Sequence, residues 1–139
     1  MPFIEWNEQF ATGIQEFDDD HKHLVRLLNK AYDDFLLGAP NNCVLDILNE
    51  LILYASHHFA AEEEWMIKHS YPKLPEHKED HDSFTKTVLE LQVGFHHGRE
   101  HISLDVLTFL KRWVKNHILE TDADYARYNK SVVLVNGTL

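Results

Sequence analysis

Histidine is the residue type in this chain whose number and spacing suggest chemistry. The 139 residues include 11 histidines, spread along the sequence rather than gathered in a terminal tag. His77 and His81 are four residues apart, as are His58 and Glu62, so on a helix each pair lies on one face. Imidazole nitrogens and carboxylate oxygens are common metal ligands. This spacing places possible metal ligands together on helix faces.

Four stretches of the sequence have apolar residues at the spacing of an amphipathic helix. We expect these helices at about 19–37, at 42–69, from Pro75 to Gly98, and after Ser103. The connections between them are short, so neighbouring helices run antiparallel. The sequence therefore predicts an all-α protein with an up-down-up-down antiparallel four-helix bundle at about 19–128. The whole chain, 1–139, is expected to form a single domain.

The ends of the expected helices carry further signals. Asn41 and Asn42 are expected to cap the second helix, and one acid of the run Asp18–Asp20 is expected to cap the first. The residues before the first helix are expected to be irregular. The apolar segment Ser131–Val135 is expected to pack on the bundle as a short C-terminal tail.

Each of the four expected helices carries at least one histidine on its apolar face. His21 stands three residues before Leu24, and His117 stands three residues after Val114. Burying a polar group without a partner costs on the order of 1 to 3 kcal/mol. A bound cation removes this cost by accepting the imidazole lone pairs, and bundle cores often hold metal sites built from facing helices. Five histidines and one glutamate on these faces therefore favour a metal centre.

The sequence also limits the kind of metal centre. A structural zinc site usually includes cysteine, and the chain has one cysteine, Cys43. The zinc-protease strings His-Glu-x-x-His and His-x-x-Glu-His are absent from HKEDH at 77–81. No histidine has a glutamate three residues before it, so the Glu-x-x-His pairs of carboxylate-rich di-iron bundles are missing. The predicted centre is instead rich in histidine.

Composition argues against several partners and locations. The net charge is −10 with histidine neutral, which disfavours binding to nucleic acid and to anionic membrane surfaces. The lone Cys43 cannot form a disulfide within the chain, and no apolar run approaches the roughly 20 residues of a membrane span. The N-terminus does not resemble a signal peptide. We expect a cytoplasmic monomer without direct membrane insertion.

Four sequence elements together resemble the hemerythrin family, and the resemblance runs over nearly the whole chain. In order, they are DDDHKHL, HFAAEEEWM, HKEDH and WVKNHILETD. The resemblance is closest to the single-domain bacterial members. It implies two non-haem iron ions per chain joined by an oxo or hydroxo bridge. The implied ligands are His77, His81 and His117 on one iron, His21 and His58 on the other, and Glu62 and Asp122 as bridging carboxylates.

The resemblance also implies reversible binding of dioxygen at the iron with two histidines, because that iron keeps an open coordination position. The implied role is oxygen storage or delivery to an oxygen-consuming enzyme, and the chain itself is then not an enzyme. Two alternatives remain open. One is a sensor module for oxygen, nitric oxide or redox state, and the other is a di-iron enzyme of peroxidase type.

Two positions need more than ideal helical geometry. His117 and Asp122 are five residues apart, about 140° around an ideal helix, so Asp122 can reach a metal only if the helix ends or deforms near Thr121. His57 lies about 100° around the helix from His58, so both cannot point at one centre.

The remaining histidines match no ligand position of the family and are expected at the surface or beside the ligands. They are His23, His57, His69, His96, His97 and His101. Aromatic and aliphatic side chains are expected to form a dry wall around the centre. We expect Phe59, Val114 and Ile118 to line the pocket.

Overall fold

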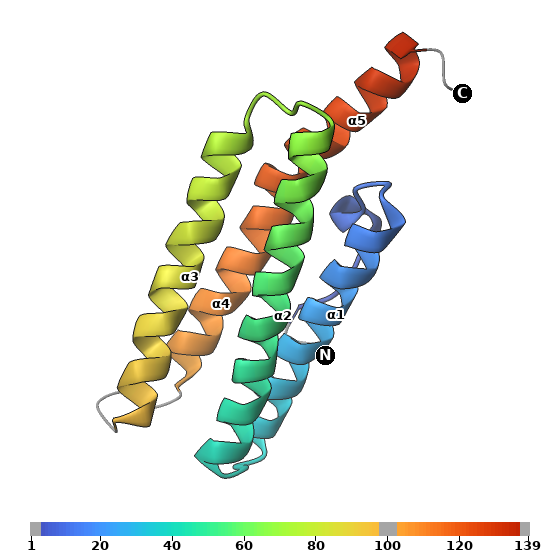
Figure 1. Cartoon of the computed structure of the whole chain (residues 1–139). Helices are drawn as coiled ribbons and strands as arrows, with labels where there is room; N and C mark the ends of the chain where they lie inside the picture. The colour runs from blue at the N-terminus through green and yellow to red at the C-terminus, as the bar shows by residue number, and fades with distance from the viewer. Residues whose placement is uncertain (1–3, 98–102, 137–139) are drawn as a thin grey trace.

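Four long helices run antiparallel, side by side, in the part of the chain that the structure describes (Figure 1). The structure is a computed structural model that describes residues 4–97 and 103–136, with the backbone alone for 9, 120–123 and 131–136. The helices are α1 (Gln15–Leu36), α2 (Asn41–Lys68), α3 (Leu74–His96) and α4 (Leu104–Asn116). They form an up-down-up-down four-helix bundle, as the sequence predicts.

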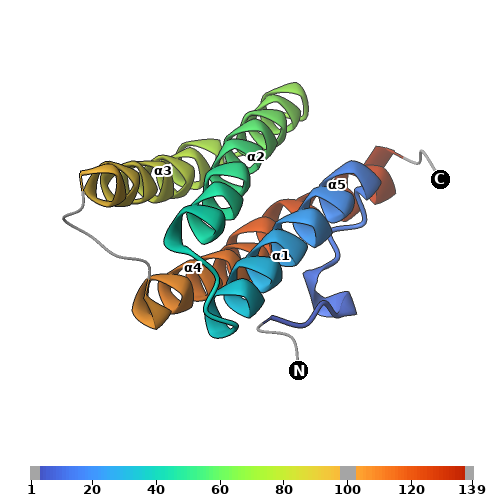
Figure 2. The ribbon, with the colours of Figure 1, turned by 90° about the horizontal axis from the view of Figure 1, so that it is seen from below.

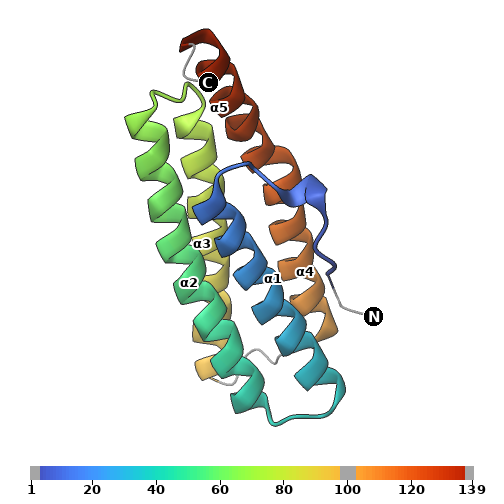
Figure 3. The same ribbon diagram turned by 90° about the vertical axis from the view of Figure 1, so that its right-hand side faces the viewer.

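The helices form two layers when the bundle is viewed along its length. One layer contains α2 and α3, and the other contains α1 and α4 (Figure 2). Helix α1 packs against both α2 and α4, and α2 packs against α3. Before α1, a short 3₁₀ helix, η1 (Glu8–Phe10), contacts the chain just beyond α4 and lies across the outside of the bundle (Figure 3).

The helix bounds agree closely with the sequence periodicity, except at the start of α1. This helix begins at Gln15, four residues earlier than expected. It ends before Gly38, which has a φ of 75°, a conformation that glycine adopts without a steric penalty. Ser103 caps α4 by accepting a hydrogen bond from the backbone N–H of Val106. The predicted stop at Gly98 lies outside the described residues.

The capping predictions for the first two helices are wrong. The N-cap of α2 is Pro40, and Asn41 is the first helical residue. Pro40 takes an extended backbone conformation, so the helix can begin directly after it. The N-cap of α1 is Ile14, and Asp18 lies within the helix. The carboxylate of Asp18 instead accepts hydrogen bonds from the backbone and side chain of Thr12, so it fastens the preceding loop to α1.

The fourth helix changes its geometry before the chain ends. At His117 the backbone enters a π-helical segment, η2 (His117–Asp122), and then continues as α5 (Ala123–Asn136). Helix α5 extends the line of α4 past the ends of α2 and α3 (Figures 1 and 3). The segment Ser131–Val135, expected as a short tail, forms the last turns of this helix.

The apolar core is divided along the bundle. The largest cluster fills the part towards the α1–α2 connection and includes the fully buried Leu28, Leu51 and Leu107. One smaller cluster lies near the opposite end, where α1 begins and α2 ends, and another joins η1 to the end of α4 and the start of η2. The buried histidine side chains lie between the largest cluster and the one at the opposite end. No helix within residues 4–97 and 103–136 is long and apolar enough to cross a membrane.

Candidate metal centre

Six polar side chains meet inside the bundle, and each is at most 4% exposed. Helix α1 supplies one of them, α2 two, α3 two, and the start of η2 one. They are His21, His58, Glu62, His77, His81 and His117. Each comes from the face of its helix that the apolar spacing predicts to be buried. The structure thus brings these six side chains together inside the bundle.

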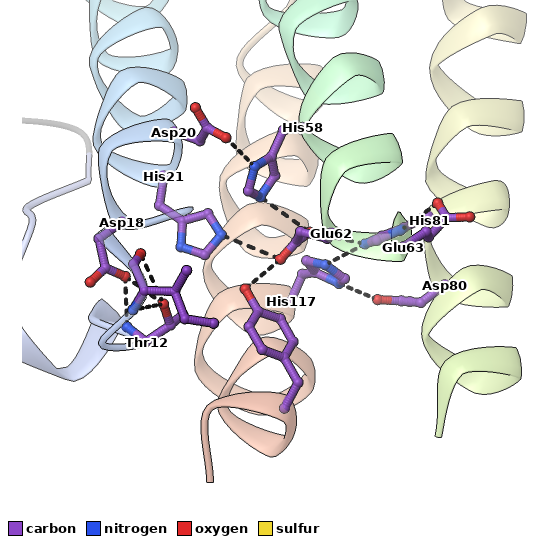
Figure 4. Close-up of polar contacts among 12 residues, drawn as sticks. Thr12, Asp18, Asp20, His21, His58, Glu62, Glu63, Asp80, His81 and His117 are labelled. Carbon is purple, nitrogen blue, oxygen red and sulfur yellow. Dashed lines mark hydrogen bonds and ion pairs between the residues drawn. The ribbon is translucent and has the colours of Figure 1, made fainter. Parts of the chain in front are cut away.

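Glu62 is common to two groups of possible metal ligands. Its carboxylate, with the imidazoles of His77, His81 and His117, forms the first group, and with those of His21 and His58 it forms the second. Within each group the ligand atoms lie within 4.8 Å of one another. Figure 4 shows His21 and His58 on one side of Glu62 and His81 and His117 on the other.

Short distances join the carboxylate of Glu62 to both groups. Its Oε1 lies 3.1 Å from Nε2 of His58 and 3.3 Å from Nε2 of His81. Its Oε2 lies 3.9 Å from Nε2 of His21. Glu62 is therefore placed so that one carboxylate can serve two neighbouring cations.

Three carboxylates outside the cluster hold three of the imidazole rings. Each accepts a hydrogen bond from the Nδ1 atom, on the side of the ring away from Glu62. Asp20 accepts from Nδ1 of His58 at 2.7 Å, and Glu63 accepts from Nδ1 of His81 at 3.1 Å. Asp80 accepts from Nδ1 of His117 at 2.5 Å. Because an ionised carboxylate only accepts hydrogen bonds, these contacts place the imidazole proton on Nδ1. The Nε2 lone pairs are left to face the cluster.

The arrangement of the Nε2 atoms fits a bound cation. Nε2 of His81 lies 3.0 Å from Nε2 of His117. When His81 and His117 donate their Nδ1 protons to Glu63 and Asp80, the Nε2 lone pairs of the two rings face each other across this distance. A cation that accepts both lone pairs removes their repulsion, and carboxylate partners on metal-bound histidines are the usual way to fix ring orientation. The donor set of imidazoles and carboxylate suits a transition metal such as iron.

The pKa shifts support this assignment of the protons. The hydrogen bond from His117 lowers the pKa of Asp80 against the opposing effect of burial. For Asp20, burial acts to raise the pKa, but hydrogen bonds from His58 and Tyr54 together outweigh it and lower the pKa. The hydrogen bond to Asp20 also raises the pKa of Tyr54 to about 12. Both aspartates are therefore anionic at neutral pH, and Tyr54 remains a donor.

A buried tyrosine from α5 also contacts the centre. The hydroxyl of Tyr125 donates to Oε2 of Glu62 at 2.6 Å, and the side chain of Tyr125 is fully buried. Its ring packs edge-on against Phe17 and lies beside Trp65. This aromatic group closes the end of the bundle over the carboxylate.

Aromatic rings also stack on the imidazoles. Phe59 lies parallel to His81 with 3.9 Å between ring centroids, and Trp113 lies parallel to His117 with 4.5 Å between centroids. These flat contacts leave little room for the imidazoles to turn. They also keep water away from the rings.

A small cavity of about 10 Å³ lies beside the centre, and its wall is apolar apart from three histidines. That volume is about what one water-sized molecule requires. His21 and His58 border the cavity, and His117 borders it from the other group. The predicted lining residues Phe59, Val114 and Ile118 all contribute to its wall. The expected apolar wall beside the centre agrees with this geometry.

The backbone at Asp122 shows the deformation that the sequence requires. The i→i+5 pattern of η2 adds one residue to the turn, which brings position 122 from about 140° to about 40° around the axis from His117. The side chain of Asp122 lies outside the described part of the structure.

The remaining histidines lie apart from the cluster wherever the structure describes them. His57, His69, His96 and His97 are exposed, and His23 is partly buried against the ring of Tyr54. His101 lies outside the described residues. The exposed position of His57 agrees with its predicted angle from His58.

Sequence reasoning missed the groups that hold the ligands in place. Asp20 and Asp80 stand next to His21 and His81 in the sequence, yet they contact His58 and His117 on other helices. Their positions inside DDDH and HKEDH were a visible signal, but their partners depend on how the helices pack. No sequence pattern points to Tyr125, because the extra residue in η2 shifts the helical periodicity before it.

Comparisons with known proteins agree with this geometry. The family model described as "Hemerythrin HHE cation binding domain" matches residues 12–128. The chain is 34% identical to a bacteriohemerythrin from Clostridium acetobutylicum over 125 residues, which cover 86% of this chain and 96% of the relative. A bacteriohemerythrin from Methylococcus capsulatus is 32% identical over 126 residues, covering 90% and 95% of the two chains. A crystal structure of wild-type hemerythrin superposes with a TM-score of 0.85 at 31% identity, covering 90% of this chain and 96% of the other.

Proposed function

Because the chain belongs to the hemerythrin family, we propose that it binds dioxygen reversibly at two non-haem iron ions. The buried cluster of five histidines and Glu62 supports this proposal, since its two ligand groups share one carboxylate. A pair of ferrous ions can supply the electrons that reversible dioxygen binding requires. The protein then needs no added reductant in each cycle of binding and release.

We assign the ligands to the two ions by the grouping of their side chains. His77, His81 and His117 would hold one iron, and His21 and His58 would hold the other. Glu62 would bridge the two ions together with Asp122 and an oxo or hydroxo group. The position of Asp122 at the end of η2 supports its inclusion.

The observation that carries the proposal is the apolar cavity beside the two-histidine group. His21, His58 and His117 border it, and Phe59, Val114 and Ile118 give it an apolar wall. Dioxygen is small and apolar, so such a cavity admits it more readily than a polar substrate. Exclusion of water also disfavours side reactions of a bound oxygen species.

The same features favour a carrier over an enzyme. Few polar groups border the cavity apart from the proposed ligands, and a polar substrate would find little to orient it there. We therefore propose that the protein stores oxygen or delivers it to an oxygen-requiring enzyme. The lone and exposed Cys43 is compatible with a reducing cytoplasm as the site of this role.

An optical experiment tests the function directly. The iron-loaded protein is reduced without air, exposed to oxygen and deoxygenated again, and iron is counted in the same sample. We expect two irons per chain and a visible charge-transfer band that appears with oxygen and disappears on its removal. Direct conversion to a stable ferric spectrum would instead favour a sensor or an enzyme. A colourless protein that retains zinc would contradict the iron assignment.

A further inference from the structure

Tyr54 is linked to the metal centre through a single carboxylate. Its hydroxyl donates to Oδ1 of Asp20 at 2.6 Å. The other oxygen, Oδ2, accepts from Nδ1 of His58 at 2.7 Å, a contact visible in Figure 4. Each oxygen of Asp20 therefore has its own donor, and the two donors lie one helical turn apart on α2.

Asp20 is the most sheltered of the three carboxylates that hold imidazole rings. Its side chain is 15% exposed, compared with 20% for Glu63 and 38% for Asp80. Lys78 lies 3.8 Å from Glu63, so that carboxylate has a cation nearby. The group that fixes Asp20 from outside is instead a neutral phenol.

The phenol ring is itself held in place between α1 and α2. It packs against the imidazole of His23, with 4.2 Å between ring centroids. Asp20 and His23 both belong to α1, whereas Tyr54 and His58 both belong to α2. The contacts of Tyr54 thus fix the carboxylate and its imidazole partner across the interface of these two helices.

Loss of this hydroxyl would leave Oδ1 of Asp20 without its phenolic donor. The carboxylate could then turn towards solvent, and the hydrogen bond to Nδ1 of His58 would be made for a smaller fraction of the time. A metal-bound histidine depends on such a partner for its ring orientation.

We propose that Tyr54 is a positioning residue for His58 that acts through Asp20. The proposal rests on the proposed function only in treating His58 as a metal ligand. The hydrogen-bond chain itself belongs to the protein without metal, so it can be tested before any metal is added.

The first test uses nuclear magnetic resonance of ¹⁵N-labelled, metal-free protein. In the Tyr54→Phe variant, we expect the Nδ1 proton of His58 to exchange with water several-fold faster than in the original protein. Tyr128→Phe is the matched control, because it removes a hydroxyl that donates to the backbone carbonyl of His69 instead. An exchange rate in Tyr54→Phe equal to that of the control would overturn the proposal.

The second test measures binding of Zn²⁺, which involves no oxygen chemistry. Replacing a partner of a metal-bound histidine typically weakens metal binding by about 10- to 100-fold. We expect this loss for Asp20→Ala and a smaller one, up to about tenfold, for Tyr54→Phe. The double variant should bind Zn²⁺ no more weakly than Asp20→Ala alone, because Tyr54 acts through that carboxylate. Fully additive losses would contradict the proposed chain.

The two tests separate this proposal from the proposed function. If the original protein binds no Zn²⁺ but proton exchange at His58 still depends on Tyr54, the positioning role stands and the metal assignment fails. If Zn²⁺ binds tightly and proton exchange at His58 does not depend on Tyr54, the metal assignment stands and the positioning role fails.

Discussion

The hydroxyl of Tyr125 donates to Oε2 of Glu62 at 2.6 Å, which joins α5 to α2 inside the bundle. Both side chains are fully buried. The contact satisfies a carboxylate oxygen that has been removed from water. The candidate metal centre therefore also depends on the fold of the chain beyond η2.

Replacing Tyr125 by Phe should therefore destabilise the metal-free protein by about 1 to 3 kcal/mol, the usual cost of removing one partner of a buried polar contact. Urea unfolding measures this change. Tyr128→Phe, whose hydroxyl lies at an exposed contact, should cost less. Equal losses for both variants would show that the buried hydrogen bond contributes nothing special.

Ligand replacement tests the composition of the centre. Glu62→Ala or His77→Ala should lower the iron content below two per chain and abolish oxygen binding. His23→Ala should preserve both properties. Because His57 is exposed and His58 is buried, His57→Ala should resemble the original protein, and His58→Ala should lose iron. Iron analysis that gave the reverse order would contradict the assigned face of α2.

The faces of the helices could be predicted from the sequence because residues four apart lie on the same side of an α-helix. This rule places the five histidines and Glu62 correctly. It cannot find Asp20 or Asp80, because each contacts a histidine on another helix. The cap of α2 was misplaced at Asn41 and Asn42 because capping preferences ignore the extended backbone that Pro40 supplies.

Filling the apolar cavity should weaken oxygen binding without loss of iron. Ala55 lines the cavity, and an Ala55→Leu substitution would occupy its space. We expect affinity for oxygen to fall about tenfold, equivalent to about 1.4 kcal/mol. Ala60→Leu is the matched control, since Ala60 lies exposed on the same helix. Oxygen titration of both iron-loaded variants decides whether the cavity receives the ligand.

The turn after α2 offers a test of backbone strain. Ser70 has a φ of 54°, and the next N–H, that of Tyr71, bonds to the carbonyl of Met66 and closes the end of the helix. A residue with a Cβ atom pays roughly 1 to 2 kcal/mol in this left-handed region. Ser70→Gly should therefore stabilise the protein by about 1 kcal/mol in thermal unfolding.

A second glycine substitution controls for composition. Ser83 lies exposed in the interior of α3, where glycine is a poor helix former. Ser83→Gly should destabilise the protein by about 0.5 kcal/mol. Effects of the same sign at Ser70 and Ser83 would contradict the strain at Ser70.

Asp80 should make stability depend on pH. Its pKa is lowered in the folded protein by the hydrogen bond from His117. Its contribution is therefore present above the unfolded value of about 3.9 and is lost as the pH falls through the lower folded value. Asp80→Asn should cost about 1 kcal/mol at pH 7. The difference from the original protein should narrow as the pH falls below about 4.

Urea unfolding of metal-free protein at several pH values measures this dependence. Asp82→Asn is the control, since Asp82 is 66% exposed and pairs with Lys78 on the surface of α3. Such exposed pairs contribute little to stability. If the difference in unfolding free energy narrowed equally for Asp82→Asn, the hydrogen bond from His117 would not be the cause of the pH dependence.

The π-helical segment η2 inserts one extra residue between α4 and α5. The faces of α5 are therefore offset by one residue from those of α4. Without the offset, Tyr125 would stand about 80° around the axis from His117, and with it the angle is about 20°. Deleting one residue among 118–121 would remove this offset. Every histidine of the cluster would remain in the sequence, yet Tyr125 and the rest of α5 would turn away from Glu62.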